Sequence, residues 1–427
     1  MLLLNRKLTM LPILKKITIC VSSIIVLASC GGGNDVASGG ASTGVTSASA
    51  VAPAANVASS NNSARTSISP TMAAIDKVGN SFTSVPAGSI LRVAYVDAFA
   101  NTFAGIPAAG FAAPDILIYA FVQSGLTSPV LDSALISAIT SAAPKQSAGS
   151  KTFISIGGQN GSSATLSNTA TVVSNVSAGI KALNATLPTA NQVVGVDLDL
   201  ENGISAATIS ALAAGFKQAG FLVSIAPQPI AGPVQAAPWN APNVDPASPN
   251  GVTGVSSALY LSSGSTSNDY GAAIASGNVD YIFAQAYNTG PGAVNIGQCA
   301  ETQTCIVGQL ATALNNLVKT SCAGSTGTPL CIPSTTRYAI GLPSIRGAAG
   351  TYTIWQPPTG APYNDQTILS ALAAEINKAP LNGKNGIMTW VLNADYSPGK
   401  DPYNDSYACT GGFSSVVFGA TQAMSCP

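Results

Sequence analysis

The sequence predicts an α/β protein in which eight parallel strands close into a (β/α)8 barrel. Eight short runs rich in β-branched and aromatic residues recur along the chain, and stretches with helical spacing of apolar residues separate several of them. This alternation favours a parallel sheet, and eight is the number of strands that closes such a barrel. The runs cover residues 91–97, 115–121, 151–157, 193–200, 221–227, 279–287, 337–343 and 386–392.

The main alternative is an open, doubly wound sheet. That fold usually carries a glycine-rich phosphate-binding turn after its first strand. The run 91–97 is followed instead by AFANTFAG, which does not match, so the barrel is favoured. In a barrel, catalytic residues lie at the carboxyl ends of the strands.

Helical spacing is clearest in four stretches that follow strand runs. They cover residues 128–143, 169–183, 204–220 and 365–379. Apolar residues recur there three or four positions apart, as on the buried face of a helix that covers a sheet.

The first 30 residues predict a lipoprotein-type signal peptide. Lys15 and Lys16 precede the apolar run 17–29, which is too short for a membrane-spanning helix of ~20 residues but suits a signal sequence. The run ends in Leu-Ala-Ser-Cys, which resembles a bacterial lipobox with Cys30 as the lipidated residue. An ordinary secretory signal with a chance cysteine is the alternative. We therefore expect an exported protein, either secreted or a lipoprotein of the outer membrane or cell surface, that contacts membrane only through its lipid.

Residues 31–87 predict a linker between this anchor and the barrel, which we place at residues 88–427. From residue 31 to about 65 the chain is mostly Gly, Ala, Ser, Thr, Val and Asn, which cannot bury enough surface to offset the entropy of ordering. Residues 66–87 fit either a linker or an arm that packs on the barrel.

The composition excludes several kinds of chemistry. The chain has 17 basic and 17 acidic residues, so nothing favours a nucleic-acid partner. It has no histidine, which excludes Ser-His-Asp and Cys-His nucleophiles and His-ligated zinc. Carboxylates, tyrosine, lysine or a metal held without histidine are left to carry the chemistry. We expect no metal, no cofactor and a monomer.

Six cysteines remain after Cys20 and Cys30 of the signal region, and an even number in an exported domain suggests disulfides. Six cysteines allow 15 connectivities. Pairing of sequence neighbours is preferred, as staples of loops and not as metal ligands. The pairs would be Cys299–Cys305, Cys322–Cys331 and Cys409–Cys426.

The stretch VVGVDLDLENG, residues 193–203, places three carboxylates two residues apart in a chain with only 8% charged residues. Alternate residues of a strand share a face, so Asp197, Asp199 and Glu201 point into the barrel while the intervening valines and leucines pack under helices. Carboxylates about 6–7 Å apart repel when ionised, so at least one should remain protonated and available as a general acid. The alternatives are a solvated edge strand and a calcium site, although calcium loops are irregular and carry glycine and Asn or Asp ligands.

These residues resemble the DxxDxDxE signature of glycoside hydrolase family 18, the chitinase family. Five more stretches match that family's motifs in the same order, and the resemblance spans residues 91–395. They are SIGG (155–158), APQ (226–228), QAYN (285–288), GLP (341–343) and MTW (388–390). Only about 22 residues separate the seventh run from its helix, so the small α+β insertion of many members is absent, as in the short hevamine-like and bacterial type.

The resemblance implies a role for each of these residues. Glu201 would protonate the glycosidic oxygen, and Asp199 would orient the substrate's 2-acetamido group, whose carbonyl oxygen attacks the anomeric carbon. Asp197 would share a proton with Asp199, and Tyr287 would donate to the acetamido group. The implied substrate contacts are Gln285, Asn288, Gln228, Ser155 and the apolar floor Trp390.

Two positions depart from the family pattern. Val194 replaces the first aspartate of the signature and lies on the other strand face, which affects proton sharing by Asp197 and not the acid itself. Asn202 follows Glu201 where many members have an aromatic residue. Trp239 and Trp355, in proline-rich loops, are candidates either for stacking on sugars or for loop packing.

The activity implied is retaining, endo-acting hydrolysis of β-1,4-linked N-acetylglucosamine polymers such as chitin and chitooligosaccharides. An endo-β-N-acetylglucosaminidase acting on N-glycans would use the same residues. A carbohydrate-binding protein without catalysis on the same fold is disfavoured, because Glu201 is present.

Overall fold

The computed structural model describes part of the chain. The described residues are 84–86, 88–122, 130–159, 166, 168–232, 243–251, 257–289, 294–349, 352–355, 365–400 and 405–427. Cys30, most of the predicted linker and Trp239 lie outside them. No helix in these ranges is long and apolar enough to cross a membrane.

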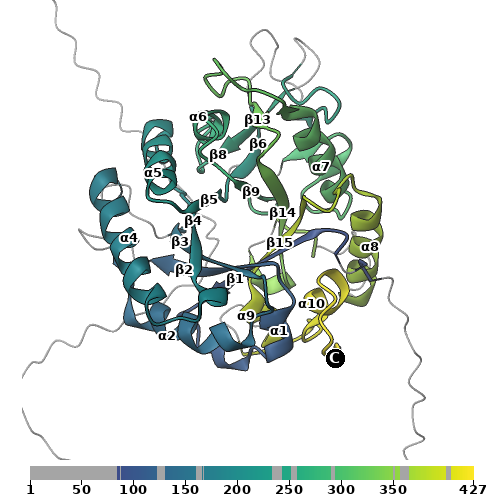
Figure 1. Cartoon of the computed structure of the whole chain (residues 1–427). Coiled ribbons are helices and arrows are strands. Elements are labelled where there is room, and N and C mark those ends of the chain that lie inside the picture. Colours follow the sequence, from purple (N-terminus) through teal and green to yellow (C-terminus); the bar gives the residue numbers. More distant parts are fainter. Residues whose placement is uncertain are drawn as a thin grey trace, which may run out of the picture.

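Eight parallel strands form a closed barrel, as the sequence predicts (Figure 1). β1 pairs with both β2 and β15, which closes the ring. The order around the barrel is β1-β15-β14-β9-β5-β4-β3-β2. The strands are β1 (Leu91–Asp97), β2 (Ile116–Val122), β3 (Lys151–Gly157), β4 (Val193–Asp199), β5 (Leu222–Ile225), β9 (Tyr281–Gln285), β14 (Arg337–Pro343) and β15 (Gly386–Trp390).

Helices surround the barrel, and the four predicted ones correspond to α2, α4, α5 and α8 (Figure 1). Asp132, Asn168 and Ser205 cap α2, α4 and α5 by accepting backbone N–H groups of the first turn, as expected of these residue types. The helices are α1 (Ala108–Ala112), α2 (Ser133–Ala142), α4 (Thr169–Asn184), α5 (Ala206–Gln218), α6 (Gly271–Ala275), α7 (Ile306–Leu317), α8 (Asp365–Lys378), α9 (Leu392–Tyr396) and α10 (Gly412–Val417). Short 3-10 turns are η1 (Phe103–Gly105), η2 (Ala143–Lys145), η3 (Thr189–Asn191) and η4 (Arg346–Ala348).

The alternation of β4 separates two apolar clusters. Val196, Leu198 and Leu200 belong to the large cluster between barrel and helices. Phe153 belongs to the cluster inside the barrel, where its ring lies over Gly195; a Cβ on that glycine would approach the ring to 2.4 Å. The two faces of β4 are therefore those that the sequence predicts.

Two connections contain strands that the sequence pattern did not reveal. Between β5 and β9 lie β6 (Gln228–Gly232), β7 (Asn243–Val244), β8 (Ala258–Ser262) and α6, with β6 and β8 paired antiparallel. Between β9 and β14 lie β10 (Asn295–Ile296), β11 (Cys299–Ala300), α7, β12 (Val318–Lys319) and β13 (Ile332–Pro333). β7, β10, β11, β12 and β13 have two residues each, which is too few to show alternation in the sequence.

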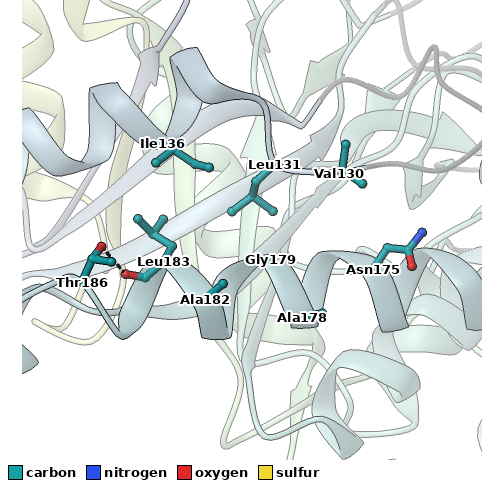
Figure 2. Close-up of a pocket in the computed structure, with 9 residues that line it drawn as sticks. All are labelled: Val130, Leu131, Ile136, Asn175, Ala178, Gly179, Ala182, Leu183 and Thr186. Atoms are coloured by element: carbon teal, nitrogen blue, oxygen red, sulfur yellow. Dashed lines mark hydrogen bonds between the residues drawn. The ribbon is translucent and has the colours of Figure 1, made fainter.

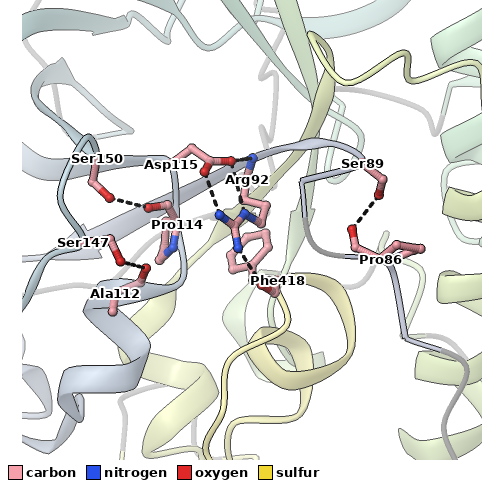
Figure 3. A network of polar contacts seen from close by, with 9 residues as sticks. All are labelled: Pro86, Ser89, Arg92, Ala112, Pro114, Asp115, Ser147, Ser150 and Phe418. Carbon is pink, nitrogen blue, oxygen red and sulfur yellow. Dashed lines mark hydrogen bonds and ion pairs between the residues drawn. The ribbon is translucent and has the colours of Figure 1, made fainter.

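The amino end of the barrel is closed by contacts to the C-terminal segment. The Arg92 guanidinium donates to Asp115 Oδ1 at 2.7 Å and to the carbonyl of Phe418 at 2.9 Å (Figure 3). The Val85 side chain is buried, and its N–H donates to the Val416 carbonyl at 3.0 Å. This part of the segment 66–87 thus contacts the barrel.

Three disulfides are formed, and they join the sequence neighbours as predicted. The pairs are Cys299–Cys305, Cys322–Cys331 and Cys409–Cys426. Trp355 is fully buried and donates its Nε1–H to the Pro343 carbonyl at 2.8 Å, so its role is loop packing and not sugar stacking.

Candidate functional site

Asp197, Asp199 and Glu201, which we call the acidic ladder, lie at the carboxyl end of β4, inside the barrel. Asp197 aligns with Ser155 of β3 on one side and with Ser224 of β5 on the other. Because aligned residues of a parallel sheet share a face, all three side chains enter the lumen. Asp199 stands one step higher, and Glu201 follows just beyond the end of the strand.

Asp197 is fully buried and is held by three hydroxyl groups. Tyr95 and Ser155 donate to its Oδ2, each at 2.7 Å, and Ser224 donates to its Oδ1 at 2.6 Å. Burial raises the pKa of Asp197, and these hydrogen bonds oppose the shift. Val194 lies near the amino end of β4, 38% exposed, so the bonding of Asp197 is completed without it.

Asp199 is also buried, and its Oδ1 accepts a hydrogen bond of 2.9 Å from Gln285 Nε2. That amide also donates to the Ala226 carbonyl at 2.8 Å, which fixes its orientation. Burial raises the pKa of Asp199 well above its usual range, and the charges of Glu201 and Asp197 raise it further. Asp199 and Glu201 therefore titrate together, and burial and mutual repulsion favour keeping a proton on the pair.

Glu201 is half-buried at the upper end of the ladder. Burial raises the pKa of its carboxyl group to about 7. A carboxylic acid with such a pKa holds its proton in weakly acidic solution and can donate it to a reacting group. The next residue, Asn202, has a φ of 64°, a conformation that asparagine tolerates better than an aromatic residue. Its Nδ2 donates to the Gln159 carbonyl at 2.6 Å.

The glycine pair of SIGG lets β3 approach the ladder. Gly157 aligns with Asp199, and a Cβ on it would lie 2.1 Å from the Asp199 carbonyl oxygen. Gly158 donates its N–H to the same oxygen at 2.6 Å and leaves room for the ring of Phe121. A side chain at Gly157 would push β3 away from β4, and one at Gly158 would displace the Phe121 ring.

Trp390 lies at the carboxyl end of β15, half-buried beside the ladder. Phe121 stacks on it with ring centres 5.7 Å apart, and Tyr95, which bonds Asp197, meets it edge-on at 5.8 Å. This gives the lumen an apolar aromatic wall next to the carboxyl groups.

The remaining predicted contacts divide between the site and its supports. Tyr287 is 5% exposed, two residues past Gln285. Asn288 exchanges hydrogen bonds with the backbone of Tyr352, which positions a neighbouring loop. Ser155 is fully buried and bonded to Asp197. Gln228 is 9% exposed, and its Oε1 has no hydrogen-bond partner among the described residues.

Several residues of the site escaped the sequence analysis. Tyr95, Ser224 and Tyr270 contact the ladder or its backbone, and Phe121 stacks on Trp390 beside it. A signal was present for Ser224, since it is the one polar residue in the apolar run 221–226, just as Ser155 is in 153–156. A single hydroxyl inside a buried strand needs a partner, and here the partner is Asp197.

A separate groove of about 680 Å³ lies outside the barrel, between α2 and α4 (Figure 2). Its lining is mostly apolar, with Ile136 on one helix and Leu183 on the other. No carboxyl group is among the residues that line it.

The barrel places the three carboxyl groups of the ladder at the carboxyl ends of its strands, where barrels of this kind carry their active sites. No protein-family model matches the chain, and no curated protein does. Its fold is similar to a GH18 chitinase of Pseudoalteromonas aurantia at 20% identity, covering 71% of this chain and 95% of that one, with a TM-score of 0.44.

Two further solved structures are similar. A plant class V chitinase mutant from Cycas revoluta in complex with (GlcNAc)3 has 16% identity over 71% of this chain and 96% of its own, with a TM-score of 0.40. A fungal endo-β-N-acetylglucosaminidase of family 18 has 16% identity over 72% and 84%, with a TM-score of 0.38.

Proposed function

We propose that this protein is a glycoside hydrolase of family 18. It cleaves internal bonds of β-1,4-linked N-acetylglucosamine polymers, chitin or chitooligosaccharides. The observation that supports this most is the ladder itself. A carboxyl group with a pKa raised to about 7 stands above a buried aspartate held by Gln285, at the carboxyl end of a barrel strand. The matching motifs occur in family order around it.

In the proposed reaction, Glu201 gives its proton to the glycosidic oxygen as the bond to the anomeric carbon breaks. The carbonyl oxygen of the substrate's 2-acetamido group attacks that carbon and forms a cyclic intermediate. Asp199 orients and stabilises the acetamido N–H, with Tyr287 beside it. Ionised Glu201 then takes a proton from water, which opens the intermediate with net retention of configuration. Trp390 supplies the apolar floor for the sugar.

Replacing the acid tests the reaction. Glu201→Gln should lower turnover of chitin oligomers by more than about 100-fold, because the amide cannot donate the proton, while binding remains. Turnover is measured by product analysis, and binding by titration calorimetry. Glu375→Gln on α8, whose carboxylate pairs with Lys378 at the surface, is the matched control and should keep wild-type turnover. Full activity in Glu201→Gln would refute the mechanism.

The same assay distinguishes the substrates. Chitin oligomers should be cleaved in preference to a high-mannose glycopeptide, and NMR of the first product should show the β-anomer, as retention requires. Preference for the glycopeptide would make the protein an endo-β-N-acetylglucosaminidase instead. Binding of either sugar without any cleavage would make it a carbohydrate-binding protein.

A further inference from the structure

We propose that Asp269 and Tyr270, two adjacent residues before α6, are positioning residues that hold the loop carrying Glu201; this rests on the proposed function of Glu201. The loop needs such support because β4 ends at Asp199 and the acid lies beyond the paired strand. Both supporting residues belong to the β5–β9 connection, in which the paired strands β6 and β8 precede the short helix α6. Neither touches the reacting atoms in this proposal.

Tyr270 holds the backbone directly before Glu201. Its side chain is fully buried, and its hydroxyl accepts the Leu200 N–H at 2.8 Å. The same hydroxyl lies 2.9 Å from the Leu200 carbonyl and 3.2 Å from the Leu198 carbonyl, to which it can donate its proton. One phenol therefore supplies hydrogen bonds that a neighbouring strand would otherwise give, at the point where β4 ends.

Asp269 organises a tight turn at residues 262–265, at the end of β8, which we call the serine turn. Its Oδ2 accepts from the Ser263 N–H at 3.0 Å, from Ser263 Oγ at 2.8 Å and from Ser265 Oγ at 2.6 Å. Ser262 Oγ in turn accepts the N–H groups of Gly264 and Ser265. Asp269, Ser262 and Ser263 are all buried, so water cannot replace these bonds.

The serine turn contacts the loop directly after Glu201. The Gly203 N–H donates to the Ser263 carbonyl at 2.8 Å, and Ser263 Oγ lies 3.0 Å from the Ile204 carbonyl. Gly264 packs so closely that a Cβ there would lie 3.3 Å from the Asn202 nitrogen. The backbone on both sides of Glu201 is thus held by one dipeptide, through Tyr270 before the acid and through the turn of Asp269 after it.

The test compares Tyr270→Phe, Asp269→Asn and Ser263→Ala with wild type on chitin oligomers. Each should lower kcat about ten-fold and leave KM within about two-fold, because a misplaced acid slows proton transfer without changing how the sugars bind. The matched controls remove the same groups at the far end of the barrel. Tyr338→Phe loses a buried hydroxyl bonded to Asn315, and Asp115→Asn loses the partner of Arg92. Both should keep the wild-type kcat, even where unfolding temperatures fall.

Amide hydrogen exchange gives a readout independent of turnover. The Gly203 N–H should exchange at least about ten-fold faster in Asp269→Asn and Ser263→Ala than in wild type, and equally slowly in the controls. Wild-type kcat in all three variants, with normal exchange at Gly203, would overturn the inference. If wild type itself fails to cleave chitin oligomers, the proposed function fails, and exchange at Gly203 alone then decides whether the loop is held as described.

Discussion

At the scale of single residues, three carboxyl groups of one strand are given three environments. Asp197 has three hydroxyl donors, Asp199 has one amide donor and two charged neighbours, and Glu201 is half-buried at the end. The pleat of the strand predicted that they share a face. It did not predict the donors. Tyr95, Ser155 and Ser224 come from other strands, and the sequence of a single strand does not give its register with β4.

The first consequence concerns pH. The pKa of Glu201 lies near 7, and the acid acts in its protonated form, so kcat/KM should fall as pH rises through about 7, tenfold per unit above it. A pH profile from about pH 4 to 9 on a soluble chitin oligomer measures this. A plateau that continues to pH 9 would contradict the raised pKa. Lys378→Gln, a charge change on exposed α8, is the control and should leave the profile in place.

At the scale of elements, the loop after β9 is held by a buried carboxyl group. Glu301, between the paired Cys299 and Cys305, is fully buried and accepts a 2.6 Å hydrogen bond from Thr289 at Oε2. Its Oε1 has no partner among the described residues. Burial raises the pKa of Glu301 to about 7. Thr289 comes directly after Tyr287 and Asn288, so this bond anchors the QAYN segment.

Glu301→Gln should therefore change stability in a pH-dependent way. The folded-state pKa lies above the unfolded one, so wild type loses stability as pH rises from about 4.5 to 7, by at most about 3 kcal/mol, because the charged form is disfavoured in the fold. The neutral glutamine removes that loss. Urea unfolding should show equal stability of the two proteins near pH 4 and a more stable variant near pH 8. Glu375→Gln should show no such difference; equal curves for Glu301→Gln and wild type at pH 8 would refute this explanation.

The strands of the barrel were predictable because each lies within an apolar run of seven to nine residues, and the helices between them show their own period. The β6–β8 pair was not predictable, since β6 is QPIAG, in which a proline and two small residues hide the pattern of a strand. The same connection contains Asp269 and Tyr270, which lie between β8 and α6. The type of each barrel element could thus be predicted from the sequence. The contacts of Asp269 could not, because they form only when the β5–β9 connection folds.

At the scale of the whole molecule, the chain combines a barrel with an N-terminal region outside the described residues. We propose that Cys30 is lipidated and anchors an exported protein through the linker that follows. Cys30→Ala should then release the protein from membrane to soluble fractions of cells, as followed by fractionation and immunoblotting, with catalytic turnover unchanged. Cys20→Ala is the matched control and should remain with the membrane. Membrane association of Cys30→Ala would contradict the anchor.

The bonding of Asp197 has a consequence for how the protein folds. Ser155 and Ser224 lie on β3 and β5, the two strands beside β4, whereas Tyr95 lies on β1, which is not adjacent to β4 in the barrel. An assembly of β3, β4 and β5 alone would therefore give Asp197 two hydroxyl donors. The third donor arrives only when β1 takes its place in the ring, so the complete bonding of this buried carboxyl group reports that the barrel has closed.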